Sequence, residues 1–316
     1  MHDHIYGPLI STGHLQAHAE LLGDVFGMQC LAEVELDDAA VHDLWGVHER
    51  TARTALYQTP GTETGIRLVQ FDPVSEVVMR DRHRGDQHDA LKVIDFYVPD
   101  FAAAVARLED AGHRLKDAIA EYDLPEGHFR EAHLWAPDEV VYALIAGPAG
   151  FMAGLVHVVD RPFSEVMSLS TPVTNRAAAV AFYRQAFGFD EVYRYGFDDA
   201  SFADLVGSAD EMRLTAINVG TSLLDPYFGL IDYGPASARA RSLANRCQLP
   251  HRGIAAAVIY TDRLKQVVDS CRQHGHEVVA GPAMADLPPH GIVPSALIRA
   301  PHGVLHHVIE PGPGIV

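Results

Sequence analysis

Two runs of strand-forming residues place carboxyl, phenol and hydroxyl groups at alternate positions. Asp95 and Tyr97 share one face of the first run, and Ser168 and Ser170 share one face of the second, because alternate side chains of a strand point the same way. A carboxyl group can act as a general base when burial raises its pKa toward neutrality. Asp95 is therefore a candidate general base, and Ser168 and Ser170 are candidate binding groups for a polar small molecule.

A further candidate for proton transfer lies near the end of the chain. His306 and His307 are adjacent in a run of apolar residues, so their side chains point to opposite faces of the expected strand. Histidine gains and loses a proton near neutral pH. His307 is the residue that we expect to face a ligand, and a hydrogen-bonded histidine in the core is the alternative.

The elements that must position these residues recur four times. Gly27, Gly112, Gly188 and Gly275 each follow a helical stretch, as glycine does where a helix ends, and the intervals between them are 85, 76 and 87 residues. A period of this size indicates a duplicated supersecondary unit. The strand runs that begin the units are residues 5–11, 91–98, 165–173 and 253–260, and the helical stretches that follow them are residues 14–26, 101–111, 176–187 and 263–274.

Each helical stretch is followed by several short apolar runs that glycine, proline and aspartate interrupt, a pattern typical of antiparallel strands. The unit is therefore βαβββ, and the predicted fold class is α+β with four such modules. Pairing neighbouring modules predicts two domains, with a linker of small residues at 149–154. The first domain is residues 1–150 (modules about 1–75 and 90–150), and the second is residues 160–316 (modules about 160–236 and 250–316).

Composition excludes several classes of partner. The net charge of -18 disfavours nucleic acid and anionic membranes, which both select basic surfaces. No apolar run reaches the roughly 20 residues of a membrane-spanning helix. Three scattered cysteines provide no disulfide framework, and the first residues show no export signal, so we expect a cytoplasmic protein.

Three segments resemble motifs of a known superfamily. Residues 172–189 resemble its strand-end, AxxFYxxxLGF helix and glycine stop, residues 296–303 are similar to its YFRDPDG hairpin, and residues 133–138 echo that hairpin. With the βαβββ repeat, they identify the chain as similar to the vicinal oxygen chelate superfamily, which includes glyoxalase I, bleomycin-resistance proteins, fosfomycin-resistance enzymes and extradiol dioxygenases. Four modules on one chain most resemble the dioxygenase branch.

This resemblance implies that paired modules curl their mixed or antiparallel sheets into cups. Members that bind a metal hold it with His, Gln or Glu side chains from the first and last strands of the modules. In this chain the corresponding positions are Pro8, Val93, Ser168 and Ala255 on first strands, and Arg67, Ala143, Gly229 and His307 on last strands. Only His307 is a plausible ligand, whereas a catalytic site needs about three. We therefore predict no metal or other cofactor.

The resemblance also groups the candidate residues into two cups. In the first domain, Asp95, Tyr97 and Arg67 face one cup and bind a polar ligand, unless Arg67 and Asp95 form a structural ion pair. In the second domain, the side chains expected to line the cup are Ser168, Ser170, His307, Tyr260 and Arg299. His307, Asp95 and Tyr97 are the predicted catalytic residues, and the other five are predicted to bind substrate.

Three functions follow from the resemblance. The first is a glyoxalase-like or dioxygenase-like enzyme that acts on a small carbonyl or aromatic molecule by lyase or isomerase chemistry, without the usual metal. The second is an extradiol-type dioxygenase or glyoxalase-like metalloenzyme with Fe, Mn or Zn. The third is a bleomycin-resistance-like protein that binds a small molecule without turnover. The expected partner is a small molecule, and a homodimer through strand edges is a further expectation.

Overall fold

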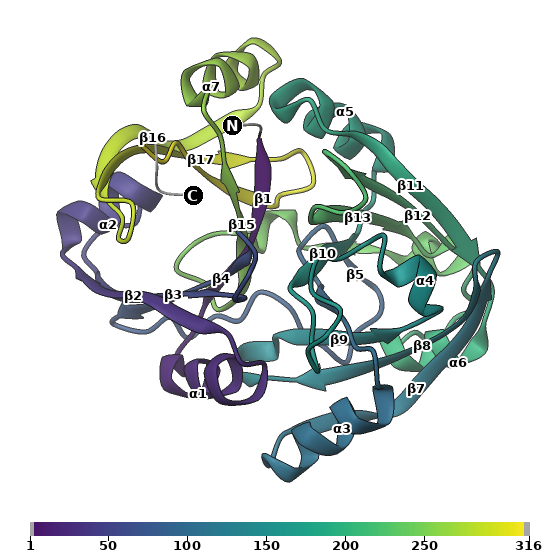
Figure 1. The fold of residues 1–316 in the computed structure, drawn as a ribbon. Helices are drawn as coiled ribbons and strands as arrows, with labels where there is room; N and C mark the ends of the chain where they lie inside the picture. The colour runs from purple at the N-terminus through teal and green to yellow at the C-terminus, as the bar shows by residue number, and fades with distance from the viewer. Residues whose placement is uncertain (1–2, 313–316) are drawn as a thin grey trace.

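The computed structural model describes residues 3–312 and has an α+β architecture of two curved eight-stranded sheets (Figure 1). The first sheet contains, in spatial order, β16 (Glu277–Asp286), β17 (Ile292–Arg299), β18 (Leu305–Ile309), β15 (Gly253–Tyr260), β1 (His4–Ser11), β4 (Gly65–Asp72), β3 (Thr51–Gln58) and β2 (Gln29–Leu36). The second contains β11 (Asp190–Phe197), β12 (Leu214–Gly220), β13 (Tyr227–Asp232), β10 (Val166–Pro172), β6 (Val93–Tyr97), β9 (Val141–Ala146), β8 (Gly127–Trp135) and β7 (Arg114–Leu124). A short parallel pair, β5 (Gln87–His88) with β14 (Arg241–Ser242), lies apart from both.

The four βαβββ modules are confirmed, but their expected pairing is wrong. The first sheet joins module 1 to module 4, drawn in purple and yellow-green in Figure 1, and the second joins module 2 to module 3. In every module the first strand pairs in parallel with the last strand, and its other edge is left for a second module. These free edges meet antiparallel, β1 with β15 and β6 with β10. Since all four modules offer the same edge, the local sequence does not decide which two join.

The consequence is that neither half of the chain forms a cup alone. We call the concave side of the sheet made by modules 1 and 4 hollow 1, and that of the sheet made by modules 2 and 3 hollow 2. The expected linker at 149–154 contains a short helix, α4 (Ala149–Met152), and Met152 is buried against hollow 2.

The four module helices occur where the sequence predicts them. They are α1 (Leu15–Glu20), which continues as a π-helical stretch (Leu21–Val25), α3 (Phe101–Asp110), α5 (Arg176–Phe187) and α7 (Leu264–Gln273). The sequence did not predict two further helices, α2 (Asp38–Trp45) and α6 (Ala200–Val206). Gly27, Gly112, Gly188 and Gly275 all have a positive φ, between 68° and 81°. Glycine adopts this left-handed conformation without the steric cost that a Cβ imposes, so it ends all four helices.

Removing one helix cap tests how much these local signals contribute to stability. The side chain of Asn175 accepts a hydrogen bond from the amide of Ala178 at 3.0 Å, at the start of α5. We expect Asn175→Ala to lower the free energy of unfolding by about 1 kcal/mol, because the amide loses its acceptor. Urea denaturation measures the change. Asn175→Ser, which keeps an acceptor, should lose only a few tenths of a kcal/mol; equal losses in the two variants would contradict the assignment.

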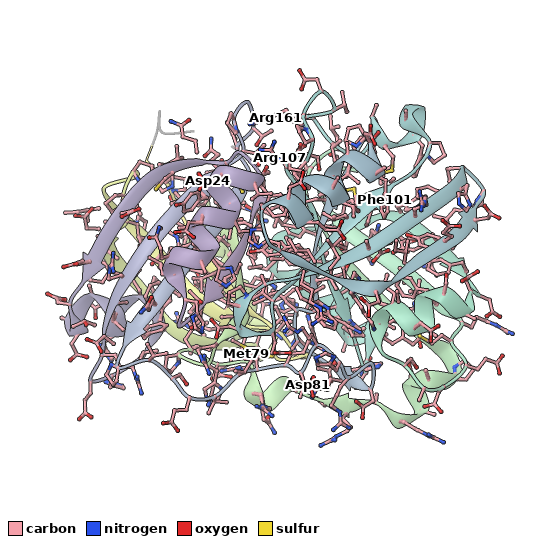
Figure 2. All side chains as sticks on the ribbon, turned by 90° about the horizontal axis from the view of Figure 1, so that it is seen from below. Asp24, Met79, Asp81, Phe101, Arg107 and Arg161 are labelled. Carbon is pink, nitrogen blue, oxygen red and sulfur yellow. The ribbon has the colours of Figure 1, made fainter. Side chains whose placement is uncertain are left out.

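The convex faces of the two sheets share one apolar core with α1, α3, α5 and α7. Two arginines reinforce this junction by donating to backbone carbonyls at the end of the first helix (Figure 2). Arg107 of α3 donates to the carbonyls of Val25 at 2.9 Å and Asp24 at 3.0 Å, and Arg161 donates to that of Gly27 at 2.8 Å. The two half-barrels are therefore one packed unit.

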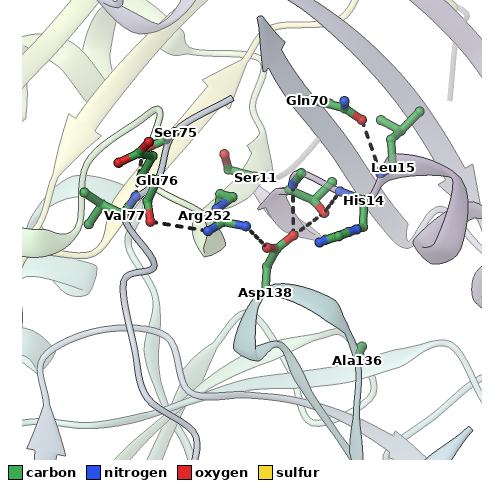
Figure 3. Close-up of polar contacts among 12 residues, drawn as sticks. Ser11, His14, Leu15, Gln70, Ser75, Glu76, Val77, Ala136, Asp138 and Arg252 are labelled. Carbon is green, nitrogen blue, oxygen red and sulfur yellow. Dashed lines mark hydrogen bonds and ion pairs between the residues drawn. The ribbon is translucent and has the colours of Figure 1, made fainter. Parts of the chain in front are cut away.

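A second polar junction surrounds Asp138, in the turn between β8 and β9 (Figure 3). Its Oδ2 accepts hydrogen bonds from the Thr12 hydroxyl and, at 2.9 Å, from the Gly13 amide. Its Oδ1 accepts one from Arg252 at 2.7 Å. Asp138 thus ties module 2 to modules 1 and 4.

Within residues 3–312, no helix is long and apolar enough to cross a membrane.

Candidate functional site

Asp95 lies at the centre of hollow 2, on the face of β6 that strand alternation predicts. It is 5% exposed, and β10 places Ser168 directly opposite it in the sheet. The hydroxyls of Ser168 and Ser170 both donate to Asp95 Oδ2, the latter at 2.6 Å. Burial, together with the negative charge of Glu131, raises the pKa of Asp95 to about 7, although the two hydroxyl donors lower it. This carboxyl group can therefore take up and release a proton near neutral pH.

Three further polar side chains form a buried chain beside Asp95. Glu131 Oε1 lies 3.0 Å from His133 Nε2, and the hydroxyl of Tyr122 donates to Glu131 Oε2 at 3.1 Å. Burial lowers the pKa of His133 and outweighs the opposing effect of Glu131. His133 is thus held largely neutral by its surroundings, with the ring oriented by a carboxylate, an arrangement suited to hydrogen bonding with a ligand.

Lys92 brings an amine into the same hollow. It precedes β6, is 4% exposed, and places Nζ 3.3 Å from the hydroxyl of Tyr233 and 3.4 Å from the carbonyl of Val206. Burial, and secondarily the charge of Arg80, holds its pKa well below the usual value. Lys92 and Asp95 are three residues apart, so a regular strand would place them on opposite faces, but both line one cavity because Lys92 precedes β6.

Hollow 2 contains two small adjoining cavities of about 40 Å³ and 50 Å³. Asp95, Tyr122, Ile145, Ser170 and Tyr195 line both. The outer wall comes from the short helices that cover the hollow, α4 and α6, and from aromatic side chains on the strands. Because a cavity of roughly 150 Å³ holds benzene, either space alone accommodates only a very small ligand.

The structure regroups the predicted site residues. Asp95 contacts Ser168 and Ser170, although the sequence predicts Asp95 in one cup and the two serines in the other. Arg67 instead lies on β4 of the other sheet, so the predicted pairing of Arg67 with Asp95, as a ligand site or as an ion pair, is wrong. His307 and Tyr260 are likewise in the first sheet and cannot act with the two serines. Both errors follow from the module pairing.

The two remaining predicted site residues, Tyr97 and Arg299, do not line the cavities of hollow 2. Tyr97 shares the face of Asp95 but lies further along β6, and the two cavities are lined by other residues. Arg299 forms an ion pair with Glu277 at 2.8 Å and donates to the carbonyls of Cys247 and Gly303. These contacts anchor the end of β17.

Hollow 1 is filled by side chains rather than open. Trp45, at the end of α2, is 2% exposed and packs edge-on against His307 and Phe71, with ring centroids 6.0 Å and 5.5 Å away. Arg67, 1% exposed, lies among Tyr6, Tyr260, His290 and His307. Hollow 2 is consequently the better candidate for an active site.

The side chains of both hollows do not fit a metal ion of the kind that the fold family implies. In hollow 1 the last-strand positions are Arg67 and His307, and a fixed guanidinium charge beside the histidine opposes a divalent cation. Among the described residues, only Asp81, His83 and Glu139 bring three possible ligand atoms within 4.8 Å. That group lies outside the hollows at the protein surface, where Figure 2 shows Asp81, and Glu139 already accepts a hydrogen bond from the amide of Arg82.

A large depression of about 1190 Å³ is an open acidic groove away from both hollows. Three of its carboxylates form ion pairs with neighbours: Asp3 with Arg263, Glu191 with Arg194, and Asp190 with Arg184. Volume alone therefore does not make it the active site.

Sequence reasoning missed Glu131, His133, Tyr122 and Lys92. A signal for the first two was present, because Glu131 and His133 alternate with Ala132 and Leu134 on β8 and so share one face. Tyr122 and Lys92 gave no comparable signal, since a tyrosine or a lysine at a strand is most often at the surface or in the core.

Comparisons with known proteins agree with this architecture. Residues 155–305 match the model of the Glyoxalase/Bleomycin resistance protein/Dioxygenase superfamily. Glyoxalase I from Zea mays is similar over 98% of this chain and 92% of its own, with 13% identity and a TM-score of 0.63. A putative dioxygenase from Bacillus subtilis is similar over 98% of this chain and 86% of its own, with 12% identity and a TM-score of 0.59. No curated protein matches the sequence significantly.

The structural similarities at these identities establish the fold, and the family model establishes kinship for the second half of the chain. The first half repeats the same βαβββ module and completes both sheets. Residues 155–305, which hold modules 3 and 4, therefore belong to the glyoxalase/bleomycin resistance/dioxygenase superfamily, and the chain as a whole has the glyoxalase I fold, with four modules that form two half-barrels.

Proposed function

We propose that hollow 2 binds a small carbonyl compound and that Asp95 exchanges a proton with it, in a lyase or isomerase reaction that uses no metal. The observation that supports this most strongly is a buried carboxyl group with a pKa of about 7, which two hydroxyls orient beside a cavity. A base with a pKa near the working pH is efficient in both accepting and returning a proton.

Each neighbouring group has a role in this proposal. Ser168 and Ser170 bind Oδ2 of Asp95, so Oδ1 is the oxygen that faces the ligand. The Asp95 carboxylate takes a proton from the carbon next to the carbonyl and returns it to another atom of the same compound. Lys92 is the hydrogen-bond donor for the oxygen that gains negative charge, whereas the ring N–H of His133 is directed to Glu131. Tyr97 and His307, which do not line this space, receive no part in the proton transfer.

The size of the two cavities favours one of the functions that the sequence left open. The residues between them, Tyr122 and Tyr195, would have to turn aside before an aromatic ring could enter. A compound of a few carbon atoms fits better than an aromatic substrate or a large antibiotic. The side chains of the two hollows do not fit a metal ion, which also favours the metal-free reaction over the metalloenzyme.

A homodimer remains an expectation from the sequence, and light scattering can test it.

Proton exchange in heavy water tests the proposal without knowledge of the substrate. Pyruvate, acetoacetate and dihydroxyacetone are the probes, and proton NMR follows the loss of their C–H signals. We expect wild-type protein to accelerate exchange for at least one probe, and Asp95→Asn to lower that rate by at least about a hundredfold, in line with the loss of a general base. The rate should rise with pH through a midpoint near 7, because Asp95 acts in its ionised form.

The controls separate this proposal from the alternatives. Arg67→Met, in the other hollow, should retain exchange, and prolonged dialysis against a chelator should leave the wild-type rate unchanged. Exchange that requires added Fe, Mn or Zn would support the metalloenzyme instead. No acceleration with any probe, or equal rates in wild type and Asp95→Asn, would refute the proposed chemistry.

A further inference from the structure

Hollow 1 contains a buried guanidinium that lacks a counter-charge. Arg67 is 1% exposed and shares its face of β4 with Val69 and Phe71, which belong to the apolar filling of this hollow. Arginine stays protonated at all ordinary pH values. Its Nε and Nη2 atoms have no hydrogen-bond partner among the described residues. Burying an unpaired charge in an apolar interior costs free energy, so we expect Arg67 to bind a partner.

No buried carboxylate of the described chain is available to neutralise Arg67. Besides Asp138, whose buried side chain pairs with Arg252, the carboxylate residues that are buried within residues 3–312 are Asp3, Asp89, Asp95, Glu131 and Glu165. All of them accept hydrogen bonds from other groups, two in hollow 2 and three at loops or at the start of strands. None forms an ion pair with Arg67. The counter-charge must therefore come from outside the described part of the chain.

The neighbours of Arg67 are uncharged and polar. The hydroxyl of Tyr260 lies 2.8 Å from Nε2 of His290, and the positive charge of Arg67 acts on Tyr260, His290 and His307. Burial, and then Arg67, lowers the pKa of His290 to about 4 and of His307 to about 3, so both rings are neutral at pH 7. Both ring nitrogens of His307 and Nδ1 of His290 are without partners in the described structure.

From this geometry we propose that hollow 1 is a binding site for a small monocarboxylate, with Arg67 as its charged partner. The two unpartnered nitrogens, Nε and Nη2, form one edge of the guanidinium and present parallel N–H groups, which match the two oxygens of a carboxylate. Neutral His307 and Trp45, whose Nε1 is also unpartnered, add hydrogen-bond donors on the same side of the sheet.

The apolar filling sets the size of the anion. Trp45, Val41 and Leu44 of α2 are almost fully buried against this hollow, so a carboxylate that binds Arg67 can carry little or no side chain. Formate and acetate are therefore the probes of choice. This site is separate from the proposed acid–base site, because Arg67 and Asp95 belong to different sheets.

Thermal denaturation at constant ionic strength tests the site. A ligand that binds the folded state raises the melting temperature as its concentration passes the dissociation constant. We expect saturable stabilisation by formate, a smaller effect of acetate, and a weaker one of chloride, which lacks a second oxygen. Arg67→Met should weaken formate binding by roughly tenfold to a hundredfold, the equivalent of one lost charged hydrogen bond. The exposed Arg53→Met, on the adjacent strand β3, is the matched control and should bind formate as wild type does.

If Arg67→Met does not fold, two other measurements still test the proposal. Line broadening of ¹³C-formate by wild-type protein, reversed by excess acetate, reports binding without any variant. Asp95→Asn should leave the formate response unchanged, whereas loss of the response in that variant would place formate in hollow 2 and overturn the assignment. Equal responses in wild type and Arg67→Met, chloride as effective as formate, or no saturable response at all would also contradict it.

Discussion

Asp95→Asn is expected to stabilise the protein by about 4 kcal/mol near pH 9 and by less than about 1 kcal/mol near pH 4. The pKa of Asp95 rises from 3.8 in the unfolded chain to about 7 in the folded one, so the folded state binds the proton more tightly. Stability therefore falls as the pH rises from about 4 to about 7, and above that the full cost of a buried charge is present. Asparagine is uncharged and avoids this cost, while its oxygen still accepts from a serine hydroxyl.

Urea denaturation of both proteins across this pH range measures the difference. Asp117→Asn, at an exposed position on β7, is the matched control and should show no such pH-dependent gain. Ser168→Ala and Ser170→Ala should each raise the pKa of Asp95 further, because the donors that favour its ionised form are removed. A constant difference between wild type and Asp95→Asn at all pH values would show that Asp95 has an ordinary pKa.

Asp138→Ala is expected to cost about 3 to 5 kcal/mol of stability, because it leaves the charge of Arg252 without its partner in a largely buried site. The Asp138 side chain is 2% exposed and that of Arg252 is 20% exposed. The variant also removes the acceptor for Thr12 and Gly13, which precede the first helix. The effect should appear as a lower urea midpoint with an unchanged slope.

Two further variants separate charge from backbone geometry at this position. Asp138 has a φ of +59°, which asparagine tolerates better than alanine. Asp138→Asn should therefore cost clearly less than Asp138→Ala. Combining Asp138→Ala with Arg252→Met should cost less than the sum of the single changes, since no charge is then left unpaired. Additive losses would indicate that the two side chains do not interact.

The sequence was sufficient to predict the modules and their elements. Glycine stops, the cap at Asn175 and the apolar periodicity of α5 are local signals, and local signals define single helices and strands. The pairing of modules was wrong because it depends on which two equivalent strand edges meet, over a sequence separation of about 250 residues for β1 and β15. No residue near those edges encodes the choice in a readable form.

For the candidate site, too, the sequence predicted the faces of single residues but not which of these residues meet. Asp95, Ser168 and Ser170 were correctly placed on inward faces, because alternation along a strand determines the face. Their contact with one another depends on the junction of β6 with β10, and the separation of Arg67 from Asp95 depends on the same choice. The occupation of hollow 1 by Trp45 could not be anticipated, since α2 lies between two strands of module 1, where the expected βαβββ unit has no helix.

The most direct test of the account is the titration of the aspartate side-chain carboxyl groups by ¹³C NMR, with Asp95→Asn to assign the resonance. We expect one carboxyl signal with a midpoint near pH 7 that is missing from the variant spectrum. If the signal that the variant loses titrates below about pH 5, close to the ordinary value for aspartate, Asp95 is not poised for proton transfer and hollow 2 is not the site proposed here.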